Sequence, residues 1–156
     1  MRLSFILLGI IFIGSCKERI EHSLEIEPET EIFEMYRCHI NDLTNLDHSG
    51  LMLHYADEDN HVLFGDGEYW GNYKTVSDIW ENFIQDTKKI LEWNTSNEYV
   101  NLLSKNSASY LMEYYSVRIN KSGDTLKVRG SVGYGLKKLD GNWKIVTTNV
   151  FHHEVR

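Results

Sequence analysis

The last third of the chain alternates apolar and polar residues with the period of two that is typical of β-strands. Residues 127–152 contain two such runs, joined by Asp140-Gly141, the dipeptide that favours a tight two-residue hairpin turn. If Leu139 and Asn142 flank the turn, one face of this hairpin is mostly apolar and the other is polar. The predicted apolar face consists of Val128, Val132, Tyr134, Leu136, Trp143, Ile145, Thr147 and Asn149. A hairpin this long needs a cover for that face, so we expect the preceding chain to pack on it.

Three segments in the first half of the chain carry the helical period instead. Pro28 suits the first turn of a helix, after which apolar residues recur at helical spacing as far as Leu43. Asp47 or Ser49 is expected to cap a short second helix, and the helical period returns over 76–87. Extended segments are expected at 62–64, 68–70, 91–95, 98–103 and 107–119. Because helices precede a run of strands, the pattern predicts an α+β domain with its helices on one face of an antiparallel sheet.

Three motifs resemble the nuclear transport factor-like superfamily, which includes ketosteroid isomerases and polyketide cyclases. They are LHYAD at 53–57, GEYWG at 67–71 and LDGNWKIV at 139–146, with the expected elements between them. The resemblance spans nearly all of the chain after residue 28. It implies a curled antiparallel sheet packed on three N-terminal helices to form a cone-shaped cavity, and it implies frequent homodimers. This fold hosts enzymes, binding proteins and assembly modules, so the resemblance leaves the function open.

The beginning of the chain carries the features of an export signal. Arg2 is followed by an apolar run over 3–13, and Gly14-Ser15 are small residues directly before Cys16. This ending resembles the bacterial lipobox, in which cleavage leaves a lipid-modified cysteine as the first residue; a plain signal peptide is the alternative. The expected location is the bacterial cell envelope, facing the periplasm or the exterior. We therefore expect a lipoprotein signal peptide at 1–15, a polar tether at 16–28 and one domain at 29–153.

Composition and charge narrow the classes of partner. The chain has 156 residues, of which 42% are hydrophobic and 25% charged, and this is ordinary for one globular domain. It carries 16 Lys and Arg against 23 Asp and Glu; Arg2 would leave with the signal peptide, so 15 against 23 gives a net charge of −8. The acidic excess argues against a nucleic-acid partner and against binding to anionic lipid. A lipid on Cys16 would then be the only membrane contact, and with only Cys38 left no disulfide could form within the chain.

Aromatic and polar side chains near the expected cavity are the candidate ligand-binding residues. Asn149 occupies the position at which many relatives carry a histidine, and an amide cannot act as a general base. His39 lies on the apolar stripe of the first helix and is the candidate for a titrating pocket residue; a core histidine bonded to backbone or water is the alternative. Glu113 would face the cavity only if the odd-numbered side chains of 107–119 do, and the pattern does not decide between the two faces. The residues expected to contact a ligand are Tyr36, His39, Tyr69, Trp70, Tyr134, Thr147 and Asn149.

The sequence contains no compact metal-ligand spacing and no phosphate-binding or nucleophile motif, so we expect no metal and no cofactor. The leading hypothesis is a lipid-anchored monomer or homodimer that binds a small, mostly apolar ligand in the cavity without converting it. The first alternative is an acid–base enzyme of isomerase or cyclase type that uses the same cavity, with its catalytic residues unassigned. The second is a protein-interaction module that uses the outer sheet face, where Val146 and Val150 interrupt the polar side chains.

Overall fold

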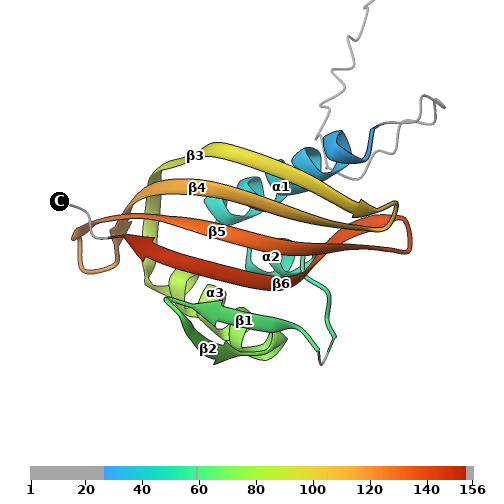
Figure 1. The fold of residues 1–156 in the computed structure, drawn as a ribbon. Coiled ribbons are helices and arrows are strands. Elements are labelled where there is room, and N and C mark those ends of the chain that lie inside the picture. The colour runs from blue at the N-terminus through green and yellow to red at the C-terminus, as the bar shows by residue number, and fades with distance from the viewer. Residues whose placement is uncertain (1–26, 59, 154–156) are drawn as a thin grey trace, which may run out of the picture.

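The helices all lie on one face of a single curled sheet (Figure 1). The computed structural model describes residues 27–58 and 60–153. The predicted signal peptide, Cys16 and all of the predicted tether except residues 27 and 28 lie outside the described residues. The predicted α+β class, with a curled sheet packed on three helices, is confirmed. No helix within the described part of the chain is long and apolar enough to cross a membrane.

Local sequence signals account for where the helices begin. The three helices are α1 (Pro28–Thr44), α2 (His48–Met52) and α3 (Tyr73–Asp86). α1 starts at Pro28, as predicted, because the first turn of a helix does not need that backbone N–H. Asp47 caps α2: its carboxylate accepts a hydrogen bond of 3.0 Å from the N–H of Gly50. Asn72 caps α3 through a bond of 3.1 Å from the N–H of Lys74.

Six strands form the sheet, in the spatial order β2-β1-β6-β5-β4-β3. They are β1 (Val62–Gly65), β2 (Glu68–Gly71), β3 (Thr87–Ser104), β4 (Ser107–Asn120), β5 (Thr125–Leu139) and β6 (Asn142–His153). All neighbours are antiparallel except β1 and β6, which run parallel, so the predicted antiparallel sheet has one parallel pairing. The segments predicted at 91–95 and 98–103 are one strand, β3, whose pairing with β4 shifts near Asn97, a residue with a φ of +50°.

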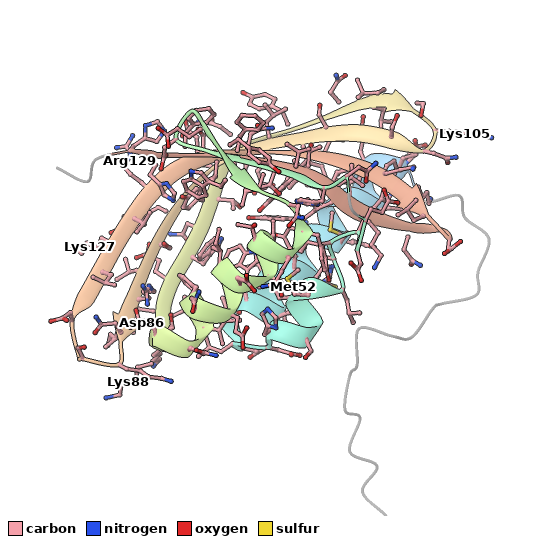
Figure 2. All side chains as sticks on the ribbon, turned by 90° about the horizontal axis from the view of Figure 1, so that it is seen from below. Met52, Asp86, Lys88, Lys105, Lys127 and Arg129 are labelled. Carbon is pink, nitrogen blue, oxygen red and sulfur yellow. The ribbon has the colours of Figure 1, made fainter. Side chains whose placement is uncertain are left out.

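The curl gives the sheet a concave side, along which α3 lies (Figure 2). Asp86 at the end of α3, Lys88 on β3 and Lys127 on β5 lie at one end of the molecule, whereas Lys105, at the tip of the β3–β4 hairpin, lies at the other end. The register between β3 and β4 shifts at four places, and each such bulge bends and twists the strands that contain it. The bulges therefore help to wrap the sheet around the helices.

The β5–β6 hairpin turns at Asp140-Gly141, as predicted. The two turn residues have φ angles of +48° and +79°, and a type I′ turn requires both to be positive. The predicted register holds from the turn as far as Leu136, which pairs with Ile145. There the register shifts by one, because Val146 is an extra residue in β6 that has no partner in the ladder.

The bulge at Val146 reverses which side chains of β6 face the helices. Beyond it, Tyr134 pairs with Thr148 and not with Thr147. Because side chains alternate between the two faces of a strand, one inserted residue moves every later side chain to the opposite face. The prediction that Thr147 and Asn149 share a face with Tyr134 is therefore wrong.

Trp143 joins the hairpin to α1 and lies on the covered face, as predicted. It is 4% exposed. Its indole N–H donates a hydrogen bond of 2.9 Å to Oε2 of Glu31. The ammonium of Lys138 pairs with the same carboxylate and lies 5.7 Å from the centroid of the indole ring. A large buried ring and a shared carboxylate thus fix the sheet to the first helix.

Replacing Trp143 with alanine should lower the free energy of unfolding by about 3–5 kcal/mol, because it removes a large buried ring and leaves a void. Trp143→Phe keeps most of the ring but loses the N–H donor, so it should cost about 2 kcal/mol. Urea denaturation of the wild type and the two variants measures both differences. A loss near zero for Trp143→Ala would show that this residue does not anchor the hairpin.

Candidate functional site

A cavity of about 270 Å³ lies between α3 and the concave side of the sheet. The apolar stripe of α3 forms one wall, because residues spaced by three and four positions share a face of a helix. This wall consists of Val76, Ile79, Trp80 and Phe83. All six strands contribute to the rest, together with Tyr36 on α1 and with Tyr55, and most of the lining side chains are apolar or aromatic. A concave, mostly apolar space with a few polar groups is the usual form of a small-molecule site.

Tyr55 is the centre of a hydrogen-bonded cluster at the buried end of the cavity. Its hydroxyl accepts a bond of 2.9 Å from the indole N–H of Trp80 and lies 3.2 Å from Nε2 of His39. Tyr36 and Tyr134 line the cavity beside it, with 6.3 Å between the centroids of their rings. Burial raises the pKa of all three tyrosines above the ordinary value. These hydroxyls therefore keep their protons and act as hydrogen-bonding groups.

His39 lies behind this cluster and does not line the cavity. It is 1% exposed, and burial, with a smaller contribution from His54, lowers its pKa to about 3. The imidazole is therefore neutral at physiological pH. Its ring stacks on Tyr36 with 5.5 Å between centroids, and its Nε2 reaches Tyr55. Contrary to the prediction, His39 is out of reach of a ligand, because the stripe of α1 that carries it faces the core; it supports two rings that do line the cavity.

Two hydrogen-bonding groups in the cavity wall make no well-aligned hydrogen bond within the described part of the chain. Thr148 on β6 is buried, and its Oγ1 makes no hydrogen bond. Nε1 of Trp93 on β3 makes no well-aligned hydrogen bond either, but it interacts with the nearby hydroxyl of Tyr36. Leaving a buried polar group unpaired costs roughly 1–3 kcal/mol. A ligand atom that pairs with either group would remove that cost.

Trp70, His152 and Asp66 meet at the exposed end of the cavity. Asp66-Gly67 is the two-residue turn between β1 and β2, with φ angles of +52° and +88°. Gly65 lets the Trp70 ring lie across β1, since a Cβ there would come within 2.2 Å of the ring. The indole stacks on His152 with 6.2 Å between centroids, and Nδ1 of His152 lies 2.9 Å from Oδ2 of Asp66. Hydrogen bonds from the backbone N–H and the ring of His152 lower the pKa of Asp66, so this carboxylate is ionised.

Of the residues expected to contact a ligand, the structure brings Tyr36, Trp70 and Tyr134 together in the cavity. Thr147 and Asn149 lie on the outer side of the sheet because of the bulge in β6. Tyr69 is also on the outer side, where it is 62% exposed. It points away from the cavity because side chains alternate along β2 and its neighbour Trp70 points inward.

Sequence reasoning missed several polar groups of the cavity, which include Ser116 and Arg118 on β4 as well as Tyr55, Thr148 and His152. Tyr55 is part of the LHYAD motif, so the sequence indicated where it lies in the fold but not that it lines the cavity. Thr148 and His152 face the cavity only because of the bulge, which no residue of the strand signals. Glu113 lies on the outer side of β4, where it accepts a hydrogen bond of 3.0 Å from Asn97. Among the described residues, therefore, no carboxylate lines the cavity.

The outer side of the sheet carries a row of exposed apolar side chains. Cross-strand neighbours in this row, from β2 to β3, are Tyr69, Phe64, Asn149, Gly133, Leu111 and Tyr99. The two tyrosines, the phenylalanine and the leucine are all well exposed. Val150, which was expected on this side, lines the cavity because of the bulge. We refer to this row as the outer row.

Comparison with known proteins identifies the fold. No protein-family model and no curated protein matches the chain. It is similar to a nuclear transport factor 2-like superfamily protein from Salmonella enterica serovar Typhimurium (TM-score 0.70, 11% identity, 81% of this chain and 92% of that chain). It is similar to a ketosteroid isomerase-like protein from Erwinia carotovora (TM-score 0.67, 14% identity, 83% and 100%). It is also similar to the solved structure of a hexachlorocyclohexane dehydrochlorinase (TM-score 0.65, 11% identity, 81% of this chain and 85% of that chain). The chain thus has the nuclear transport factor 2-like fold, as its motifs predicted.

The burial of a neutral His39 should make the protein less stable in acid. Between about pH 6.5 and pH 3 this histidine is protonated only in the unfolded chain, so stability falls as the pH falls through this window. Lowering the pH from 7 to 5 should reduce the free energy of unfolding of the wild type by about 2 kcal/mol more than that of the His39→Gln variant. The glutamine amide can bond to Tyr55 but does not titrate. Denaturant unfolding at the two pH values measures this difference. Equal losses in the two proteins would contradict a buried, neutral His39.

Proposed function

We propose that this chain binds a small, mostly apolar molecule in its cavity. The observation that carries the proposal is the Thr148 hydroxyl, which is buried in an apolar wall and has no partner among the described residues. A hydrogen-bonding atom of a ligand would satisfy it and would fix how the ligand is oriented. The volume of about 270 Å³ suits a molecule the size of a bicyclic aromatic compound.

The aromatic walls favour a flat ligand. Trp80 and Phe83 on α3 line the cavity together with Val132 and Tyr134 on β5. Planar rings bury much apolar surface against such walls, and each square ångström removed from water contributes roughly 25 cal/mol. The apolar body of the ligand would therefore supply most of the affinity. The Thr148 hydroxyl, together with the indole N–H of Trp93, would supply specificity.

In this proposal the domain is held at a bacterial envelope membrane by a lipid on Cys16. The support is the apolar run over 3–13 that ends in Gly14-Ser15-Cys16. The acidic balance of the chain argues against binding to anionic lipid, so the lipid on Cys16 would be the membrane contact. The cavity would then capture its ligand close to the membrane surface.

A second copy of the chain is the proposed partner for the outer row. A twofold axis brings the same face of both copies together, so an exposed apolar row can cover itself. The row carries no charged side chain, and Gly133 at its centre leaves room beside Leu111, where even a Cβ would come no closer than 3.9 Å. Such a dimer would leave the cavity of each copy accessible, because the row lies on the opposite side of the sheet.

Two probes of matched shape, 2-acetylnaphthalene and 2-ethylnaphthalene, test the binding proposal. Both should bind, but only the first has a carbonyl oxygen that can accept a bond from Thr148. Thr148→Val should therefore lower the affinity for 2-acetylnaphthalene by about fivefold to tenfold, which corresponds to one lost hydrogen bond of about 1 kcal/mol. The affinity for 2-ethylnaphthalene should not change. Ligand-detected NMR titrations give the four affinities.

Two further variants serve as controls for this experiment. Asn149→Leu changes the next residue of the same strand on the outer side, so both probes should bind it as they bind the wild type. Val132→Trp places a large ring in the cavity and should abolish the binding of both. The proposal fails if neither probe binds the wild type. It also fails if a folded Val132→Trp variant binds both probes as tightly as the wild type does.

Replacing Cys16 with serine should release the protein from membranes, because it removes the sulfur to which the lipid would be attached. Detergent phase separation of cells that express each form measures this. The wild type should enter the detergent phase and the variant the aqueous phase. A wild type found wholly in the aqueous phase would rule out the lipid anchor.

A further inference from the structure

Asp66 and His152 form a carboxylate–imidazole pair at the exposed end of the cavity. Nδ1 of His152 lies 2.9 Å from Oδ2 of Asp66, and the backbone N–H of His152 donates a bond of 2.8 Å to Oδ1. The Trp70 indole lies against the imidazole face, with an angle of 15° between the ring planes. The ring is therefore held along one edge by a carboxylate and on one face by an indole. Binding of an apolar ligand needs none of these contacts.

The carboxylate determines which nitrogen of His152 carries the proton. An ionised carboxylate only accepts hydrogen bonds, so Nδ1 of the neutral imidazole must be the donor. Nε2 then keeps its lone pair, and no hydrogen bond among the described residues uses this atom. His152 and Trp70 both line the cavity. A basic nitrogen with a fixed orientation therefore lies beside the space in which a ligand would sit.

We propose that His152, oriented by Asp66, is a general base that removes a proton from a molecule bound in the cavity. The substrate class is a flat, mostly apolar molecule with an acidic C–H bond. This inference rests on the proposed function, since the substrate must first occupy the cavity. His152 would be the catalytic residue and Asp66 a positioning residue that acts through it.

The surroundings of the pair suit proton transfer. Once His152 has taken the proton, the imidazolium is stabilised by the adjacent Asp66 carboxylate. Negative charge that develops on an oxygen of the substrate can accept a hydrogen bond from the Thr148 hydroxyl, which lacks a partner among the described residues. The His152 side chain is 42% exposed, so water can take the proton away and restore the base.

The probe 5-nitrobenzisoxazole tests for such a base directly, because its reaction needs only proton removal. Nε2 takes the proton from C3, the C–H electron pair forms the third carbon–nitrogen bond, and the N–O bond breaks. The products are 2-cyano-4-nitrophenolate and the protonated base, which returns its proton to water. The full-length protein should accelerate this reaction by about 100-fold or more over the same concentration of free imidazole. The coloured phenolate gives the rate.

Three variants assign the activity to the pair. His152→Gln should lower kcat/KM by about 100-fold, and Asp66→Asn by about tenfold, through kcat and not through KM. His153→Gln changes the neighbouring histidine, which lies on the other side of the strand, and should keep the wild-type rate. Imidazole ¹⁵N NMR supplies a readout that a purely structural role of Asp66 would not change. His152 should be the Nδ1–H tautomer in the wild type and a mixture of tautomers in Asp66→Asn.

Binding of the unreactive 2-ethylnaphthalene separates this inference from the proposed function. It should be unchanged within about twofold in His152→Gln and Asp66→Asn, which also shows that both variants keep a folded cavity. If 2-ethylnaphthalene binds but the wild type and His152→Gln convert the probe equally, the pair is not a base and the binding function stands. If His153→Gln loses as much activity as His152→Gln, the assignment to His152 is overturned. If no naphthalene binds, the proposed function itself fails.

Discussion

The bulge at Val146 determines which chemistry faces the cavity, because side chains alternate along a strand. A regular β6 would turn Thr147 and Asn149 towards the helices, whereas the inserted residue turns Thr148 and His152 there instead. One residue thus replaces the amide of Asn149 with the unpartnered hydroxyl of Thr148, and it replaces His153 with His152 on the cavity side. Both the polar contact proposed for a ligand and the proposed base depend on this single shift in register.

Burial divides the polar groups of the site into two kinds. At the inner end, Tyr55, Tyr134 and the neutral His39 are shielded from water, so burial fixes their protonation states and their mutual contacts hold the shape of the cavity. At the outer end, Asp66 and His152 pair in the presence of water. The inner groups are therefore suited to rigid support and the outer pair to proton exchange.

The helices and strands of the fold could be predicted from the sequence, whereas about half of the residues of the site could not. Pro28, Asp47 and the Asp140-Gly141 turn act through local geometry, so their effects can be inferred from neighbouring residues alone. The covered position of Trp143 followed from alternation near a well-defined turn. Beyond the bulge, each side chain of β6 faces the side of the sheet opposite to the predicted one. His152 lies next to Asp66 only because β1 and β6, which are distant in the sequence, pair with each other. Such contacts are set by tertiary packing and leave no local pattern.

The central claim is that the cavity is a binding site whose polar contact is Thr148. A crystal structure of the protein with 2-acetylnaphthalene measures this most directly. The account predicts the fused rings between α3 and β5, with the carbonyl oxygen about 2.8 Å from Oγ1 of Thr148. Density for the compound only on the outer side of the sheet, or a cavity closed by its own side chains with no compound inside, would contradict it.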